Sequence, residues 1–355
     1  MNYLGLRTRA IAAVIAVVAL GLTAGCSGSG NPKPTVTETP VVEPSKTDAP
    51  APPDVDVWPL TGVHSGQIVE RPAVAVKIEN TAAARPQTGL NEADVVWETI
   101  IEFDVSRLLA VFHSNYPEIV GPIRSVRPVD MRIYSPLEPV FVFSGGQQGI
   151  LDLVRLAPGH WLEENRGASQ MWRDHSRKAP HNLYGSVPGL AELAIDVTAP
   201  PAEQFEFAPD HDQAVAVTSG AVTNRIELRM SPASQPNWTW NNTANAWLRG
   251  EGTQAGMTSG GTQIQATNVV ILEVKAVPSG FTAQNNASVP DDVLEGEGNA
   301  TIATGGKTIA ATWHKADQNS PLTLQIAAGE PALLAPGNTW VEVLPQPNGT
   351  FTLSP

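Results

Sequence analysis

A single cysteine, Cys26, is the feature that most constrains how this chain can fold. One cysteine excludes an internal disulfide, and it excludes zinc sites built from several cysteines. The fold must therefore be held together by burial of apolar surface. The 330 residues that follow residue 25 are long enough to bury such a core, and their number predicts two domains.

The 25 residues before Cys26 have the pattern of an export signal peptide. Arg7 and Arg9 form a basic start, and an uncharged, mainly apolar run follows at residues 10–22. Its 13 residues fall short of the roughly 20 that span a bilayer. The run leads into LTAGC at 22–26, which resembles the bacterial lipobox. The resemblance implies acylation of Cys26, as by palmitate, which would anchor the protein at the extracytoplasmic face of the cell membrane and leave no catalytic thiol.

A proline-rich segment follows the predicted anchor. Residues 27–57 contain seven prolines, several Ser, Thr and Gly residues, and no aromatic residue. Such a composition cannot bury enough apolar surface to fold. We therefore expect residues 26–57 to be a lipidated tether that holds the folded part away from the membrane.

The charge of the chain is acidic overall and uneven along its length. The formal net charge is −13, which argues against nucleic acid as a partner. Eight basic residues nevertheless fall between positions 121 and 184. This local positive charge points to an anionic ligand.

The pattern of apolar residues predicts an α+β fold, with a mixed α/β domain at 58–200 and a mostly antiparallel β domain at 201–355. Pro200 and Pro201 mark the boundary between the two. In the first domain we expect strands at 73–78, 95–102, 106–113 and 139–144, a helix at 147–156, and a helix capped by Ser186. In the second we expect strands at 215–218, 226–230, 268–274, 308–313 and 340–344.

Three stretches of the first domain resemble the YerB family of bacterial lipoproteins, whose paired domains have no established function. They are ARPQTGL at 84–90, leading through ADVV at 93–96 to Glu98; GPIRSVRP at 121–128; and WRD at 172–174 with RKAPHNLY at 177–184. The second domain resembles the family at 266–270, 312–315 and 336–340. One departure is the turn of the predicted hairpin, where the family often has glycines and this chain has Phe103 and Asp104.

The basic residues of the second and third stretches form the main candidate site. Arginine matches carboxylate and phosphate oxygens with two parallel hydrogen bonds, and aromatic side chains nearby add stacking surface. We expect a pocket for an anionic cell-envelope ligand, built from Arg124, Arg127, Arg173, Arg177, Lys178, His181, Asn182, Trp172 and Tyr184. Alternatively, these arginines, with Arg132, pair with carboxylates such as Asp130, Asp174, Glu98 or Glu102 and attach loops to the sheet.

A second candidate site is catalytic. Strand alternation would place Glu98 and Glu102 on one face, with Arg107 opposite them across the turn. Paired carboxylates can hydrolyse glycosidic bonds, and Asp174 or His181 would be further candidates for proton transfer. The alternative is an ion-pair ladder on the surface of the sheet.

These observations favour a non-catalytic lipoprotein that binds an anionic wall component or an envelope protein. Two alternatives remain open: a hydrolase or transferase that acts on cell-wall glycan, and a scaffold for protein partners. The sequence implies no metal and no organic cofactor.

Overall fold

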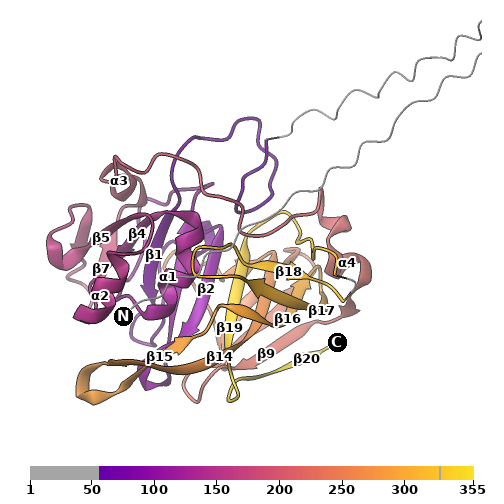
Figure 1. Ribbon diagram of the computed structural model, residues 1–355. Coiled ribbons are helices and arrows are strands. Elements are labelled where there is room, and N and C mark those ends of the chain that lie inside the picture. The colour runs from indigo at the N-terminus through magenta and orange to yellow at the C-terminus, as the bar shows by residue number, and fades with distance from the viewer. Residues whose placement is uncertain (1–55, 328) are drawn as a thin grey trace, which may run out of the picture. The chain divides into compact units, whose positions relative to one another are not determined.

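Strands from both halves of the chain form one mixed, twelve-stranded sheet in the computed structural model, which describes residues 56–327 and 329–355 (Figure 1). The predicted signal peptide, Cys26 and nearly all of the predicted tether lie outside these residues. The strands of this sheet are β1 (Val74–Glu79), β2 (Val95–Ile100), β3 (Ser106–Phe112), β4 (Val140–Phe143), β5 (His160–Glu163), β8 (Ala221–Val222), β14 (Asn268–Thr282), β15 (Ser288–Asp292), β16 (Gly296–Thr304), β17 (Lys307–Lys315), β18 (Thr323–Gln325) and β19 (Thr339–Gln346).

The two halves meet where β19 pairs in parallel with β2, with Thr339 opposite Val95 and Glu342 opposite Glu98. From this junction the N-terminal side continues in the order β2-β3-β1-β4-β5, and the C-terminal side in the order β19-β14-β16-β17-β18. In Figure 1 the orange strands β14 and β15 extend as an arm beneath the N-terminal half. Phe281 of this arm packs on Gly149, so the arm contacts the region around α2 (Gln148–Val154).

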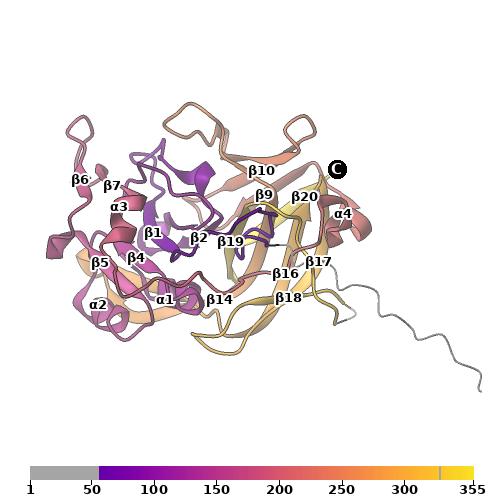
Figure 2. The same cartoon turned by 90° about the horizontal axis from the view of Figure 1, so that it is seen from above.

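Each face of the sheet buries its own apolar core. Along β1, Ala75 points to one core while Val74 and Val76 point to the other, as strand alternation requires. Helices α1 (Pro128–Tyr134) and α2 cover the first face. Helix α3 (Val187–Glu192) and a second sheet cover the opposite face (Figure 2).

The second sheet is antiparallel and belongs to the C-terminal half. It consists of β9 (Arg225–Arg229), β10 (Pro236–Asn241), β11 (Ala246–Glu251), β12 (Gln254–Ala255), β13 (Gln265–Ala266) and β20 (Thr350–Ser354). Its Trp238 packs edge-on against Trp340 of β19, with ring centroids 5.3 Å apart. A separate short hairpin joins β6 (Met171–Arg173) to β7 (Leu183–Gly185).

The α+β class is confirmed, with its strand-rich C-terminal region. The predicted hairpin is also confirmed, because β2 and β3 pair antiparallel. The helix expected at 147–156 is α2, and Ser186 caps α3 by accepting a hydrogen bond from Gly189 N at 3.3 Å. The strand expected at 226–230 is β9, and the one expected at 340–344 lies within β19.

The strand predicted at 215–218 is wrong, because these residues form helix α4 (Val215–Ser219). The β-branched residues of VAVT favoured a strand. In the folded protein the small side chains of Ala214 and Ala216 are buried, and Thr218 Oγ1 donates a hydrogen bond back to Ala214 O. Tertiary packing therefore overrides the local preference.

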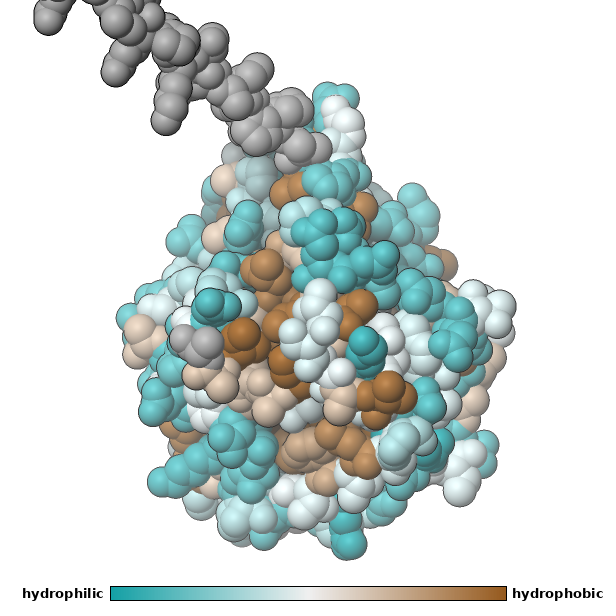
Figure 3. Space-filling view, turned by 90° about the vertical axis from the view of Figure 1, so that its right-hand side faces the viewer, coloured by the Kyte–Doolittle hydropathy of each residue, from teal (hydrophilic) through white to brown (hydrophobic). Residues whose placement is uncertain are grey.

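Figure 3 shows the face that carries the C-terminal end, where apolar side chains gather at the centre and hydrophilic ones surround them. Val222 of β8 is one of the exposed apolar residues of the C-terminal half. Within residues 56–327 and 329–355, no helix has the length and apolar character needed to cross a membrane.

A buried ion pair lies at the junction of the two halves. Arg249 of β11 donates a hydrogen bond of 2.6 Å to Glu98 of β2, and both side chains are almost fully buried. Burial alone would raise the pKa of Glu98, but the charge of Arg249 and hydrogen bonds from Ser106 and Arg249 lower it. Burial and the neighbouring Glu98 charge raise the pKa of Glu342 well above its usual value, and Glu342 Oε1 accepts a hydrogen bond of 2.9 Å from Trp238 Nε1. Arg249 also contacts Glu251 at 3.1 Å, so one arginine holds two carboxylates at this junction.

We expect Arg249→Met to destabilise the protein by about 3–5 kcal/mol, because it leaves the charge of Glu98 buried without a partner. Adding Glu98→Gln should restore part of the loss, since the unpaired charge is then removed. Urea denaturation at pH 7 measures both effects. Arg225→Met is the matched control: Arg225 pairs with Glu227 on the surface, and its loss should cost about 1 kcal/mol or less. Equal losses of stability in Arg249→Met and Arg225→Met would contradict the assigned role of Arg249.

Asp292, at the end of β15, is a buried carboxyl whose protonation links stability to pH. Burial, and then the charge of Asp291, raise its pKa to about 8. A raised carboxyl pKa favours the folded state while the group is protonated. Its contribution is therefore complete below about pH 4 and is lost as the pH rises through 8.

We expect Asp292→Asn, which stays neutral at every pH, to stabilise the protein on the order of 1–3 kcal/mol at pH 9 and by much less at pH 5. Thermal melts of the variant and the parent protein at both pH values test this. The exposed Asp152 provides the control variant, Asp152→Asn, whose effect should not change with pH in this way. A gain from Asp292→Asn that is the same at both pH values would refute the linkage.

Candidate functional site

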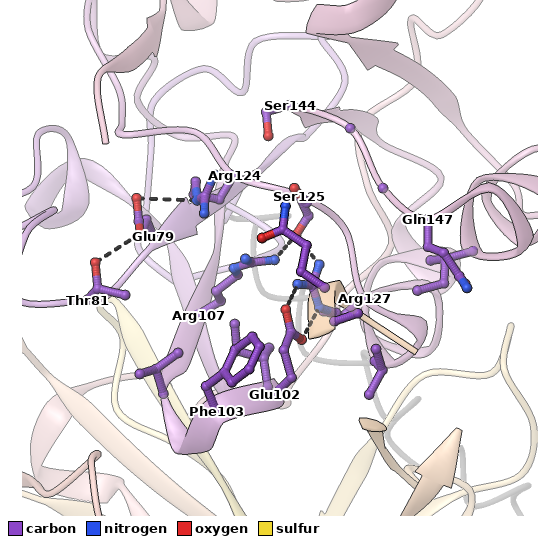
Figure 4. Close-up of a pocket in the computed structure, with 18 of the residues that line it drawn as sticks. Glu79, Thr81, Glu102, Phe103, Arg107, Arg124, Ser125, Arg127, Ser144 and Gln147 are labelled. Carbon is purple, nitrogen blue, oxygen red and sulfur yellow. Dashed lines mark hydrogen bonds and ion pairs between the residues drawn. The ribbon is translucent and has the colours of Figure 1, made fainter. Parts of the chain in front are cut away.

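A cavity of about 720 Å³ opens between the N-terminal half and the β14–β15 arm and is lined by four arginines and three glutamates (Figure 4). One wall is the 3-10 turn at Glu102–Asp104, which joins β2 to β3. A second wall is the loop at 124–127 that leads into α1, and a third is the loop at 144–147 before α2. The arm of β14 and β15 closes the remaining side with residues such as Thr282 and Gln284.

Arg107 is the central one of the arginines that line this pocket. It sits on β3 with only 5% of its surface exposed, and its Nη1 donates a hydrogen bond of 2.7 Å to Ser125 O. Within the described residues no carboxylate oxygen lies within 4.0 Å of its guanidinium. Burial, and then the charges of Arg127 and Arg124, lower its pKa to about 9. Arg107 is therefore still charged at neutral pH. The charges of Glu102 and Glu79 act on it from a distance, but no described carboxylate contacts it.

The neighbouring arginines of the predicted site have partners inside the protein. Arg127 makes two parallel hydrogen bonds to Glu102, of which the one from Nε is 2.7 Å. Arg124 lies 3.3 Å from Glu79, which also receives His181 Nδ1 at 2.9 Å. Although burial would raise it, the pKa of Glu102 is lowered by the hydrogen bond and charge of Arg127. Figure 4 shows that the side chains of Glu79, Arg124, Glu102 and Arg127 face one cavity.

The third predicted stretch contributes Arg173 and His181 to the pocket lining. Arg173 is held by Glu164 and by Asn182 Oδ1, each at 2.9 Å. Arg177 instead attaches the hairpin of β6 and β7 to the loop at 83–86, where it donates to backbone carbonyls such as Ala84 O at 2.8 Å. It also donates to the hydroxyl of the buried Tyr184.

The other predicted ligand-binding residues lie outside the pocket lining. Asn182 is buried and donates to the backbone carbonyl of Asp174, so it holds the hairpin together. Trp172 and Lys178 are exposed on the same hairpin. Arg132, on α1, pairs with Asp291 and Glu295 of the C-terminal half.

The predicted catalytic carboxylates are not brought together in one cleft. Glu98 is buried with Arg249, Ser106 and Asn80 and does not line the cavity. Glu102 does line it, but the chain leaves the strand after Ile100, so strand alternation no longer relates Glu102 to Glu98. Asp174 lies in a turn with Ser176, whose side chain and then backbone N lower the pKa of Asp174 by hydrogen bonding. His181 reaches the pocket beside Glu79.

Sequence reasoning missed two features of this pocket. It assigned Arg107 only as a partner of the glutamates, although an isolated arginine in the otherwise apolar run SRLLAVF was a signal for a buried charge. It also gave no hint that the β14–β15 arm lines a pocket of the N-terminal half, because such a contact depends on how remote strands pair.

The chain resembles known proteins along most of its described length. Residues 60–199 match the family described as "Protein of unknown function (DUF3048) N-terminal domain", and residues 226–341 match the corresponding C-terminal domain. A protein of Bacillus subtilis (strain 168), named "Putative lipoprotein YerB", is 36% identical over 138 residues. That match covers 38% of this chain and 42% of the length of the relative.

The fold is also seen in a crystal structure. The structure of the YerB protein from Bacillus subtilis superposes with a TM-score of 0.71, at 23% identity, over 83% of this chain and 99% of the other. At this identity the likeness establishes the fold. Taken with the two matched domains and the more identical segment, it identifies the chain as a member of the YerB-like family with paired DUF3048 domains.

Proposed function

We propose that this protein is a membrane-anchored lipoprotein that binds an anionic group of a cell-envelope molecule in the arginine pocket. Arg107 is the observation that carries the proposal. Burying a charge without a partner is costly, and Arg107 lies between two further arginines with no carboxylate in contact among the described residues. A phosphate or carboxylate bound in the cavity would supply the missing negative charge.

The anchoring part of the proposal rests on the lipobox-like residues 22–26 and on the name of the relative in Bacillus subtilis. Lipidation of Cys26 would hold the protein at the extracytoplasmic face of the cell membrane, and the proline-rich tether would separate the pocket from the lipid surface. The pocket would then meet wall polymers or the exposed parts of envelope proteins.

The two alternatives from the sequence receive less support. A glycosidase needs two carboxyls about 5–9 Å apart in one cleft, whereas Glu98 is enclosed with Arg249 away from the cavity. The internal pairing of Arg124, Arg127 and Arg173 is what a purely structural role would produce. Arg107 departs from that pattern, and we therefore favour binding over a scaffold.

We expect Arg107→Met to abolish anion binding and to stabilise the ligand-free protein by about 1–3 kcal/mol, because it removes a buried charge that no described carboxylate contacts. Inorganic phosphate and succinate serve as probes for the two anionic groups. At least one of these two anions should raise the melting temperature of the parent protein more than chloride does at equal ionic strength. The same anion should leave the melting temperature of Arg107→Met unchanged.

Two control variants separate binding from structure. Arg127→Met should lower the melting temperature, since it leaves the buried Glu102 without its partner. Lys178→Ala removes an exposed charge outside the pocket lining and should change neither stability nor binding. A destabilised Arg107→Met variant that still responds to phosphate or succinate as the parent does would show that Arg107 is structural.

A further inference from the structure

Phe103 stands at the pocket in a backbone conformation that a bulky side chain rarely adopts. Its φ is 64° and its ψ is 24°, in the left-handed region, and Asp104 beside it has a φ of 58°. For a residue other than glycine this region costs roughly 1–2 kcal/mol. Such strain persists where the surroundings impose it, and it marks positions that merit a functional explanation.

The protein itself makes little use of the aromatic ring. Phe103 is 57% exposed although it is one of the most apolar residues of the pocket lining. Within residues 56–327 and 329–355, no stacked pair and no cation–π contact involves its ring. Figure 4 shows the ring directed into the cavity beside Glu102 and toward Arg107.

The turn that carries Phe103 is held rigidly from several sides. Ile101 N donates a hydrogen bond of 2.8 Å to Val105 O across the turn. Ser231 of the C-terminal half donates its hydroxyl to Asp104 O, and Glu102 is held by Arg127. A ring presented on a fixed turn loses little conformational entropy when a ligand packs on it.

The rest of the lining is rich in neutral polar groups. Thr81, Ser144, Gln147, Asn165, Thr282 and Gln284 line the cavity together with the arginines. Hydroxyl and amide groups both donate and accept hydrogen bonds, so they complement the hydroxyls of a sugar. An acyl chain would instead require an apolar groove.

From these groups we infer that the ligand of the pocket is a saccharide that carries an acidic group. The acidic group binds at Arg107, one face of the sugar ring packs on Phe103, and the sugar hydroxyls bind the amide and hydroxyl side chains. This inference rests on the proposed function, and it adds the class of ligand to it. Phe103 is the residue that distinguishes such a saccharide from a simple anion.

The test compares full-length parent protein with Phe103→Gly and Phe103→Tyr by titration calorimetry. The probes are glucose 6-phosphate, glucuronate, inorganic phosphate, succinate and adenosine monophosphate. Glycine adopts the left-handed conformation without strain, so Phe103→Gly should fold at least as stably as the parent. Tyrosine keeps the ring and serves as the matched control.

We expect a sugar acid to bind the parent more tightly than the simple anion with the same acidic group. Glucose 6-phosphate is compared with phosphate, and glucuronate with succinate. Phe103→Gly should weaken the binding of the sugar acid by about 3- to 10-fold and leave the affinity for the simple anion unchanged. Phe103→Tyr should retain the tighter binding.

The outcomes separate this inference from the proposed function. If phosphate or succinate binds through Arg107 but Phe103→Gly leaves sugar-acid affinity unchanged, the saccharide assignment is wrong and the anion pocket stands. If Phe103→Gly loses more affinity for adenosine monophosphate than for either sugar acid, the ligand is a nucleotide and not a saccharide. If no probe binds, the proposed function fails and the inference fails with it.

Discussion

The buried ion pair between Glu98 and Arg249 is the interaction on which the rest of this structure depends. Glu98 lies on β2, Arg249 on β11, and Glu342 stands opposite Glu98 on β19, so three remote strands meet at one point. Parallel strands rich in apolar residues can slip in register, and a slip by one residue would turn Glu98 toward the wrong face of the sheet. The ion pair therefore sets how the two halves join.

The pocket follows from that junction. Its arginines belong to the N-terminal half, but the β14–β15 arm closes one side, and Ser231 holds the turn that carries Phe103. If β2 and β19 paired in another register, these contacts from the C-terminal half would be displaced. A rigid frame also lets the protein keep Arg107 buried with no described carboxylate in contact, because the surrounding core offsets the cost of the charge. The site is thus a property of both halves together.

The sequence predicted local elements well and remote contacts poorly. Apolar alternation and a short turn were sufficient to predict the hairpin of β2 and β3, because that pairing is between neighbours. The pairing of β19 with β2 joins segments far apart in the chain, and no local pattern specifies it. The arginines of the two loops were proposed as ligand-binding residues, and Arg124 and Arg127 line the cavity. The central Arg107 was not, since its surroundings come from other elements.

The turn at Phe103 and Asp104 shows how a local departure and the remote frame combine. Both residues have positive φ, a conformation that glycine adopts without strain. In this chain the surrounding structure holds the turn in that conformation and imposes the strain on a phenylalanine. Packing inside the protein does not offset that strain, because the ring remains more than half exposed. A ligand that covers the ring would offset the strain. Phe103 and Arg107 line the same cavity, so a ligand whose acidic group binds Arg107 would lie beside the ring.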